Sequence, residues 1–365
     1  MTTDAFSIDE LTLPTSMADE GASDYAEMIA VRNEIEIGVM GTNALTMTAA
    51  ELLPIYSDQE YSPRRMFVVR ADGRIVGRGV FAWSAEGESR SATIYGEILA
   101  RYRNGGLGTA LFDRLEGLAS EAGYDILQIF ATHTSTDGGE RVAPPTGFGD
   151  LSVSDPGVRF LLGRGYSLKQ VNRVSALDLP IAPDQLAALR QTAQDAAGPN
   201  YRVVAWAGRT PDRWVGDLAR LHNRMSVDRP QGDLDVTEET WDAARVRAND
   251  ERMEAGGRRL LTVATEHVPT GELAGFSVLW LPADVSRPVA QEDTLVLTEH
   301  RGHRLGMLLK VANLQELARH SPESTMVYTG NAEENRPMLN VNEAVGFHAI
   351  GYEGAWKKII AATAN

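Results

Sequence analysis

A glycine-rich segment, Arg103-Asn-Gly-Gly-Leu-Gly108, separates a strand-like run (residues 93–99) from an amphipathic helical pattern (residues 109–119). A turn of this kind leaves several backbone N–H groups unpaired at the start of the helix, and the helix dipole adds partial positive charge there. Such a group of N–H donors can bind an anion, for example a phosphate. The segment is therefore a candidate anion site.

A variant of this segment occurs again in the second half of the chain. His300-Arg-Gly-His-Arg-Leu-Gly306 also follows a strand-like run (294–297) and also opens a helical pattern (307–318). Aligning Arg103 with Arg301 brings Gly108 onto Gly306. One glycine-rich turn is common, but two of them in the same strand–loop–helix context indicate a duplicated unit.

The patterns around the two loops repeat in the same order. Apolar spacing predicts helices over residues 24–37 and 48–56, and an Asp72-Gly73 turn predicts a hairpin over residues 66–83. After the first loop and its helix we expect a buried strand (126–131), a loop rich in Gly and Pro (132–150), a short helix (157–163) and a strand (167–177). The second half has a strand (201–206), helices (211–225 and 237–255, the latter with a capping box from Thr237), a hairpin (259–265 with 273–280), the second loop with its helix, a strand (325–329), a helix from Asn335 and a strand from Phe347.

This order predicts two domains, residues 1–179 and 200–365, joined by a linker over residues 180–199. The linker is polar and rich in Ala and Pro, and it carries one expected helix over residues 183–197. Each half is long enough to bury a core of its own.

The composition is typical of a globular protein, with 365 residues, 43% of them hydrophobic and 23% charged. A net charge of −15 argues against nucleic-acid binding, and is compatible either with a cationic substrate or simply with solubility. The apolar runs are too short to span a membrane. The chain has no cysteine, which excludes disulfides, thiolate metal ligands and a cysteine nucleophile. Its N-terminus has no signal-peptide pattern, so we expect a cytoplasmic protein.

Taken together, these motifs resemble those of a known superfamily. The Arg-x-x-Gly-x-Gly loop between strand and helix, the following strand with Asn331 and Asn335 after it, and a helix ending in Val-Gly-Phe347 are similar to the GNAT superfamily of acyl-CoA-dependent N-acetyltransferases. Because both halves carry the pattern, the chain resembles a tandem GNAT protein, an arrangement also found in mycothiol synthase. The resemblance implies an α/β (α+β) fold with two GNAT-like domains, each a mixed, mostly antiparallel central sheet flanked by helices.

The resemblance also implies that acetyl-CoA (coenzyme A) is the cofactor, with its pyrophosphate on the loop amides. In the first half these would belong to Arg103, Asn104, Gly105, Gly106, Leu107, Gly108 and Thr109. In the second half they would belong to Arg301, Gly302, His303, Arg304, Leu305 and Gly306. The strand edges before the loops, Ile98-Leu99 and Val296-Leu297, would pair with the pantetheine amides, and Asn331 and Asn335 would also contact the cofactor.

Each half departs from the family pattern. Arg304 stands where the family prefers Gly, and a positive φ would be strained there. The first half lacks the pair of asparagines, which His133 and the Gly/Pro-rich loop replace. Leu161 and Asn342 stand where many family members have a tyrosine that protonates the leaving thiolate. A thiol pKa near ~8.5 makes unaided departure tolerable, so this loss does not exclude catalysis. Which half is catalytic stays open.

The implied reaction is transfer of an acetyl group to a primary amine of a small molecule by direct attack. The amine must lose a proton, so a carboxylate is expected as base: Glu97 in the first half, or Glu292 or Asp293 in the second. Each could equally be an ordinary charged strand end. Candidate acceptor-binding residues are Asp228, which could instead lie in a solvated turn, and Trp83 and Trp280, which end their hairpin strands.

A non-catalytic acyl-CoA-binding or sensor protein with two degenerate domains remains an alternative to the enzyme. The histidines at 222, 300 and 303 are not spaced as a metal site, so no metal is expected. We expect a monomer or a homodimer, with a small-molecule amine as partner.

Overall fold

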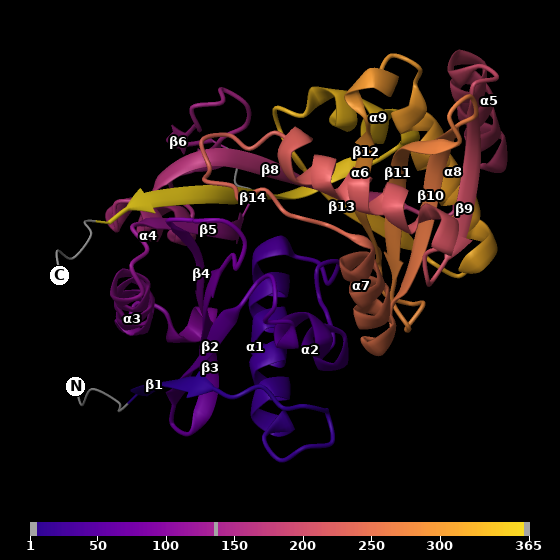
Figure 1. Ribbon diagram of the computed structural model, residues 1–365. Helices are drawn as coiled ribbons and strands as arrows, with labels where there is room; N and C mark the ends of the chain where they lie inside the picture. Colours follow the sequence, from indigo (N-terminus) through magenta and orange to yellow (C-terminus); the bar gives the residue numbers. More distant parts are fainter. Residues whose placement is uncertain (1–5, 135–137, 361–365) are drawn as a thin grey trace. The chain divides into compact units, whose positions relative to one another are not determined.

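The computed structural model describes residues 6–134 and 138–360, which form two compact units (Figure 1). Unit 1 is built from the described parts of residues 1–172, 231–237 and 351–365. Unit 2 is built from residues 173–230 and 238–350. No helix in the described part of the chain combines the length and the apolar character that crossing a membrane requires.

The sheet of unit 1 has the strand order β1-β2-β3-β4-β5-β14, and of these neighbours only β4 and β5 run parallel. The elements up to the end of the first repeat are β1 (Phe6–Leu11), α1 (Ala22–Met40), α2 (Ala49–Ser57), β2 (Arg64–Ala71), β3 (Arg74–Trp83), β4 (Ser91–Ile98), α3 (Leu107–Glu121), β5 (Ile126–His133), β6 (Arg141–Val142), β7 (Leu151–Ser152), α4 (Pro156–Gly163) and β8 (Ser167–Asp178). A core of fully buried side chains, among them Tyr25, Phe67, Leu115 and Trp356, holds helices and strands together.

The sheet of unit 2 has the order β8-β13-β12-β11-β10-β9, in which β12 and β13 are parallel. The remaining elements are α5 (Pro183–Ala197), β9 (Tyr201–Ala207), α6 (Val215–Asp228), α7 (Ala243–Ala255), β10 (Arg259–His267), β11 (Glu272–Leu281), β12 (Val289–Val296), α8 (Leu305–His320), β13 (Met326–Ala332), α9 (Arg336–Val345) and β14 (His348–Ile359). The fold class expected from the sequence, two domains each with a mixed, mostly antiparallel sheet flanked by helices, is confirmed.

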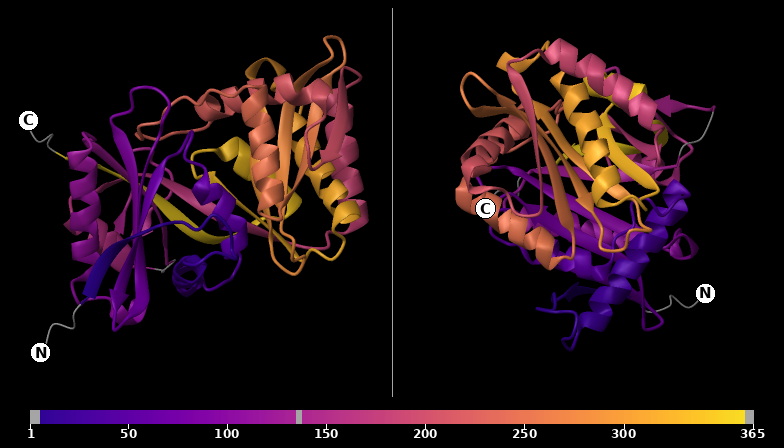
Figure 2. Two further views of the ribbon diagram at one scale, coloured as in Figure 1. Left: turned by 60° about the horizontal axis from the view of Figure 1, so that its bottom comes forward. Right: turned by 90° about the vertical axis from the view of Figure 1, so that its right-hand side faces the viewer.

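In each unit the helices cover both faces of the sheet. The left view of Figure 2 shows the strands of unit 1 between α3 (magenta) and α1 (indigo). It shows the strands of unit 2 between the α6–α7 pair and the α5–α8 pair. The anion loops therefore open helices on one face of each sheet, while α1 or α6 covers the other face.

Local chemistry explains several element boundaries. Thr48 and Glu51 form a capping box at the start of α2, because the Thr48 Oγ1 accepts from the Glu51 N–H at 3.2 Å and the Glu51 carboxylate accepts from the Thr48 N–H at 2.7 Å. Asp72 and Gly73 both have positive φ (50° and 76°), as the predicted two-residue hairpin turn requires.

The units divide the chain differently from the linear halves expected from the sequence. Helix α5, expected in a linker, belongs to unit 2, where Ala193 and Ala197 pack with Leu305 and Leu308 of α8. The end of the chain, from Gly351, belongs to unit 1, where β14 pairs antiparallel with β5. The last strand mixes apolar and charged residues in a way that fits either sheet, so periodicity does not assign it to one of them.

One helix begins later than predicted. The capping box at Thr237 does not form, and α7 begins at Ala243 with Asp242 as its N-cap, whose carboxylate accepts from the Arg245 N–H at 2.8 Å. The cause is a tertiary contact: the Asn223 side chain bonds both the N–H and the C=O of Trp241, at 2.6 and 3.0 Å. These two hydrogen bonds to the Trp241 backbone keep the segment before α7 in a non-helical conformation. Strand β1 has no fully buried residue, and most of its side chains are exposed, so it lacks the apolar pattern that predicts a strand.

Candidate functional site

The two glycine-rich loops follow the same backbone path. Asn104 and Gly106 in unit 1 have φ of 64° and 87°, and the equivalent Gly302 and Arg304 in unit 2 have φ of 89° and 54°. In both loops the arginine that begins the motif turns back to the strand: Arg103 Nε donates to the Ile98 C=O at 2.9 Å, and Arg301 Nε donates to the Val296 C=O at 3.1 Å. Arg304 thus adopts the left-handed conformation that strains a non-glycine residue.

Both loops leave room and donors for an anion. Helices α3 and α8 begin at Gly106 and Arg304 without a side-chain cap, and their first helical bonds come from the N–H groups of Ala110 and Leu308. The preceding amides have no partner within the helix and point out of its N-terminus. A Cβ added to Gly106 or Gly306 would meet no atom within 4 Å, so the space beside these amides is open. The loops therefore fit a pyrophosphate, with Leu305, Gly306 and their neighbours, or Leu107, Gly108 and Thr109, as donors.

Before each loop the two parallel strands stop pairing, and we call the unpaired stretch between them the seam. In unit 1 the register of β4 with β5 ends at the Thr93–Gln128 pair, and in unit 2 the register of β12 with β13 ends at the Ala290–Tyr328 pair. Beyond these pairs the described strands share no further register, so the later part of β4 or β12 presents backbone groups to the seam. An extended group that carries amides can bond such an edge as a strand would. The strand ends beside the seams are Ile98-Leu99 and Val296-Leu297, whose side chains are mostly buried.

The two seams differ at one point, a β-bulge. In unit 1 the β3–β4 register runs unbroken from Gly77–Ile98 to Trp83–Ala92. In unit 2 the β11–β12 register shifts between Ser277–Thr294 and Leu279–Gln291, so that two residues of β12 oppose one residue of β11. These two residues are Glu292 and Asp293. A bulge removes a residue from the ladder and re-aims its side chain, and its freed N–H can stabilise a developing oxyanion.

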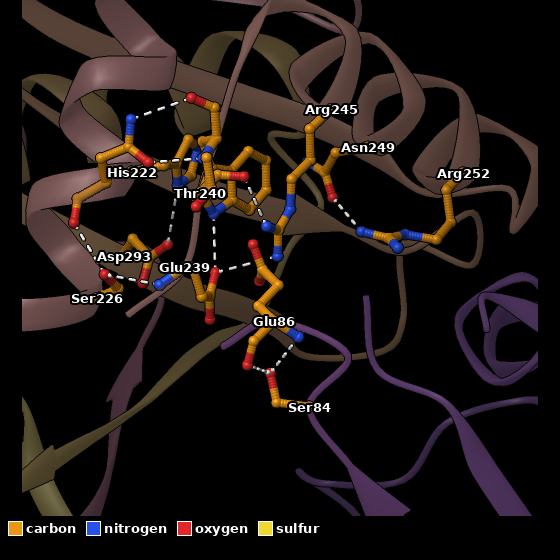
Figure 3. Close-up of polar contacts among 12 residues, drawn as sticks. Ser84, Glu86, His222, Ser226, Glu239, Thr240, Arg245, Asn249, Arg252 and Asp293 are labelled. Carbon is orange, nitrogen blue, oxygen red and sulfur yellow. Dashed lines mark hydrogen bonds and ion pairs between the residues drawn. The ribbon is translucent and has the colours of Figure 1, made fainter. Parts of the chain in front are cut away.

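Asp293 faces a neutral histidine. Its carboxylate lies 3.7 Å from Nδ1 of His222 on α6 (Figure 3). Removal from bulk water raises the pKa of Asp293 to about 6, against the influence of the Arg229 charge, and the Glu239 charge adds to the rise. Burial lowers the pKa of His222 to about 4, and the charge of Arg245 lowers it further. Near neutral pH this pair is a carboxylate beside an uncharged imidazole, so Asp293 can accept a proton.

Aromatic and polar neighbours fix the position of His222. Its ring stacks on Trp241 at 4.2 Å between centroids and meets Phe276 edge-on at 4.9 Å. The Trp241 indole N–H donates to Glu239 at 2.7 Å, and the Arg245 guanidinium lies over the Trp241 ring at 4.6 Å. Figure 3 shows Glu239, His222 and Asp293 grouped together. Arg245 also pairs with Glu239 at 3.4 Å, so the charge of Glu239 is already balanced and Asp293 is the carboxylate here that favours a cationic ligand such as an amine.

The carboxylate of unit 1 has a different environment. Glu97 forms an ion pair with the buried Arg78 at 2.5 Å, and Arg78 also donates to the Tyr56 hydroxyl at 3.3 Å. Burial raises the pKa of Glu97, but the charge and the hydrogen bond of Arg78 outweigh it and hold this pKa below its usual range. A carboxylate held in this way is a weak proton acceptor.

Asp228 is already bound to arginines. Its carboxylate accepts from Arg224 at 2.6 Å and from Arg301 of the second anion loop at 3.2 Å. It is therefore not a free carboxylate for an acceptor, and in this structure it positions Arg301. Trp83 packs on Phe81 at 5.1 Å. Trp280 lies under the Arg258 guanidinium at 5.3 Å.

The polar residues after the parallel strands have structural partners. Asn335 caps α9 by accepting from the Met338 N–H at 3.4 Å, and Asn331 accepts from the Asn342 side chain at 2.7 Å. In unit 1, His133 lies between Asp155, 3.0 Å from Nδ1, and the Trp356 indole N–H, which donates to Nε2 at 3.1 Å. The side chains of Asp155, His133 and Trp356 are all buried, so this series of hydrogen bonds has a structural role. His303 packs on Tyr201 at 5.2 Å. Among the described residues no group of His, Asp or Glu could hold a metal ion.

Comparisons with known proteins agree with this geometry. Residues 43–142 match the family model described as acetyltransferase (GNAT) family. No curated protein matches the chain significantly.

Solved structures match over nearly the whole chain. A tandem GNAT protein from the clavulanic acid biosynthesis pathway, solved without acetyl-CoA, is 21% identical, with a TM-score of 0.72 and coverage of 99% of this chain and 100% of that one. A GCN5-related N-acetyltransferase from Sphaerobacter thermophilus is 14% identical, with a TM-score of 0.61 and coverage of 98% of both chains. The glucosamine N-acetyltransferase region of a fungal multi-domain GH3 beta-N-acetylglucosaminidase is 14% identical, with a TM-score of 0.59, covering 97% of this chain and 38% of that one. The chain therefore has the fold of a tandem GNAT protein, and its residues 43–142 are similar to the GNAT acetyltransferase family.

Proposed function

We propose that this tandem GNAT protein transfers an acetyl group from acetyl-CoA to a primary amine of a small molecule, and that unit 2 carries the chemistry. The observation that supports this most is the bulge in β12. It places Asp293, with its raised pKa, at the edge of an open seam that leads to the anion loop of α8. Anion site, seam and proton acceptor thus follow one another along one strand and the helix after it.

Each part of unit 2 has a defined task in this proposal. The amides at the start of α8 and the side chain of Arg304 hold the pyrophosphate of the cofactor, Arg301 fixes the loop against β12 and Asp228, and the edge of β12 pairs with the pantetheine arm. When bound, acetyl-CoA supplies an activated acetyl thioester. Asp293 takes the proton from the amine so that the nitrogen lone pair is free to attack. Glu239, paired with Arg245, holds the Trp241 indole in place beside His222. His222, neutral and held by Trp241, keeps the Asp293 carboxylate facing the acceptor.

Unit 1 has a different role in the proposal. Its loop can bind the cofactor as well as that of unit 2, because the backbone path is the same. Its carboxylate, however, is held by Arg78. We propose that unit 1 binds acyl-CoA without transferring the acyl group. A protein that is a non-catalytic acyl-CoA binder in both units is the second candidate, and the Arg78–Glu97 ion pair favours it for unit 1 only.

A pair of matched variants tests the cofactor sites. Gly108 and Gly306 occupy the same position in the first turn of α3 and α8, and both have room for a Cβ, with no neighbour closer than 3.8 Å. Gly108→Glu and Gly306→Glu each place a negative charge beside one candidate pyrophosphate site. Calorimetry with acetyl-CoA counts the sites in the wild type and in each variant, and we expect Gly306→Glu to weaken one site by tenfold or more.

The chemistry is then followed by the release of free thiol from acetyl-CoA in the presence of a panel of primary amines. Loss of turnover with Gly306→Glu and its retention with Gly108→Glu support unit 2 as the catalytic unit. The reverse result would move the chemistry to unit 1. Absence of acetyl-CoA binding to the wild type would contradict the proposed function altogether.

A further inference from the structure

Helix α8 carries a lysine inside unit 2. The Lys310 side chain is 1% exposed, and its ammonium group lies 5.4 Å from the centroid of the Phe347 ring. In the described part of the chain no carboxylate forms an ion pair with it. Burial lowers the pKa of Lys310 to about 7, and no neighbouring charge contributes to this shift. An ammonium group that is buried without an anion is strongly unfavourable, so a structural role alone gives no reason to place it there.

Two further polar side chains of this region lack partners. Asn313, one turn after Lys310 on the same helix, is fully buried, and neither its Nδ2 nor its Oδ1 has a hydrogen-bond partner among the described residues. Asn342 on α9 is 1% exposed, and its Oδ1 also lacks a partner while its Nδ2 donates to Asn331. Buried polar groups are normally hydrogen-bonded, so these atoms indicate a polar group that enters from outside.

Unit 1 shows that the fold does not need polar residues here. Counted from the first residues of α3 and α8, the equivalents of Lys310 and Asn313 are Phe112 and Leu115. The equivalent of Asn342 is Leu161, since each lies four residues before the glycine that ends its helix region, Gly346 or Gly165. All three are buried apolar side chains. The same architecture is therefore stable with an apolar interior, and the polar groups of unit 2 are a property of that unit.

The equivalence also indicates where Lys310 lies along the sheet. Phe112 packs so closely under Gly96 of β4 that a Cβ there would overlap its ring. The residue of β12 equivalent to Gly96 is Thr294, next to Asp293. Successive residues of β11 show that α6 and α8 cover opposite faces: Phe276 touches His222 of α6, whereas a Cβ on Gly275 would meet Leu309 of α8. The equivalence thus assigns Lys310 to the α8 face of the sheet at the level of Thr294, whereas the neighbouring Asp293 lies on the α6 face with His222.

We propose that Lys310 is the proton donor to the sulfur that leaves during acyl transfer in unit 2, an inference that rests on the proposed function. When the acyl carbon–sulfur bond breaks, the electron pair stays on sulfur, and an N–H proton of the Lys310 ammonium passes to it. The neutral amine of Lys310 then takes a proton from solvent. The proton that the acceptor amine loses goes to Asp293. One proton is therefore accepted on the α6 face of the sheet, and one is donated from the α8 face.

The first measurement uses bound coenzyme A without turnover. The ultraviolet absorbance of its thiolate is followed against pH in the wild type and in Lys310→Met. A nearby ammonium stabilises a thiolate, so the bound thiol should titrate about one pH unit or more lower in the wild type than in Lys310→Met. Lys169→Met serves as a matched control, since Lys169 forms an ion pair with Asp233 in unit 1, and it should leave the titration unchanged.

The same variants separate a proton donor from a packing residue. Lys310→Met removes a buried charge, so its melting temperature should equal or exceed that of the wild type, while kcat falls by about tenfold or more. Lys310→Arg keeps the charge but not a transferable proton, so it should lower the pKa of the bound thiol without restoring kcat. Equal thiol titrations and equal kcat in the wild type and Lys310→Met would overturn the inference and leave the proposed function standing. A wild type that binds no coenzyme A would overturn the proposed function, and this inference with it.

Discussion

The two units place different side chains at the same points of their sheets. In both, the last strand pair before the anion loop joins a glycine to a branched residue, Gly77 with Ile98 and Gly275 with Val296. One residue further from the loop, unit 1 has the ion pair of Arg78 with Glu97, and unit 2 has Phe276 opposite Leu295. An ionic pair in one unit is thus replaced by an apolar pair in the other.

This replacement changes the chemistry beside the seam. In unit 1 the arginine neutralises the carboxylate and lowers its pKa. In unit 2 the apolar pair leaves no cation at this point, and Phe276 packs against His222 instead. The bulge then turns Asp293 toward that histidine in an environment that raises its pKa. Two anion loops with the same backbone path therefore lie next to carboxylates of different chemistry. Glu97 in unit 1 resists protonation, whereas Asp293 in unit 2 can accept a proton near neutral pH.

The comparison is tested most severely by removing the carboxylate of unit 2. Asp293→Asn keeps the size of the side chain but cannot accept a proton, so we expect kcat to fall by about 10² to 10⁴-fold. Thiol release with an amine that the wild type acetylates measures this. Calorimetry with acetyl-CoA controls for binding, which should not change. An active Asp293→Asn enzyme would mean that another group is the base.

The pH dependence of kcat sharpens the same point. The carboxylate form of Asp293 is the active one, so kcat should fall about tenfold per pH unit below the pKa of about 6. If Lys310 is the proton donor, kcat should also fall above its pKa of about 7, and this alkaline limb should be absent in Lys310→Met. The acid limb should disappear in Asp293→Asn, whose residual rate should not depend on pH in the acid range. Glu97, whose pKa is lowered, stays ionised throughout, so a limb that moves in Glu97→Gln would assign the base to unit 1.

The carboxylate of unit 1 should matter for stability and not for turnover. Glu97→Gln leaves Arg78, which is 7% exposed, without its counter-charge, and we expect a loss of about 1–3 kcal/mol. Thermal unfolding of the full chain at neutral pH measures it. Because the pKa of Glu97 is lowered in the folded state, its contribution is present above the ordinary value of 4.5 and is lost as the pH falls through the folded value. The difference from the wild type should therefore shrink in acid, while kcat at pH 7 should stay close to that of the wild type.

Much of the fold, but less of the site, follows from sequence. The two loops, the hairpins and the helices after the loops have local signals, namely glycines at fixed spacing, an Asp-Gly turn and apolar periodicity, and all of them form. The start of α7 could not be predicted, because it depends on Asn223, which is distant in the chain and holds Trp241 by two hydrogen bonds. The membership of β14 in unit 1 from Gly351 onward is likewise decided by its pairing with β5, for which the strand has no local signal.

The candidate site shows the same division between local and tertiary information. Asp293 and Glu97 could be identified as carboxylates on the strands before the loops, and which of them is suited to accept protons could not. That depends on a bulge and on Arg78, a cross-strand neighbour whose register the sequence does not give. The sequence gives no sign that His222 neighbours Asp293, since only the packing of α6 on the sheet brings them together. Lys310 and Asn313 have a signal in the sequence, because they are polar residues within the apolar pattern of a helix.

The smallest expected effect concerns the position before each helix, where a glycine in one anion loop is replaced by an arginine in the other. Gly106 and Arg304 both have positive φ, but only the arginine is strained by it. Arg304→Gly should therefore raise stability by a few tenths of a kcal/mol to about 1 kcal/mol, and Gly106→Arg should lower it by a similar amount. Melting temperatures of the two reciprocal variants measure this, and Arg304→Ala, which loses the charge but keeps the strain, separates the two contributions. If the strain is retained for its charge, both Arg304→Gly and Arg304→Ala should weaken acetyl-CoA binding to unit 2. An unchanged affinity would mean that the backbone amides alone hold the anion, and that the two loops are equivalent in function as well as in shape.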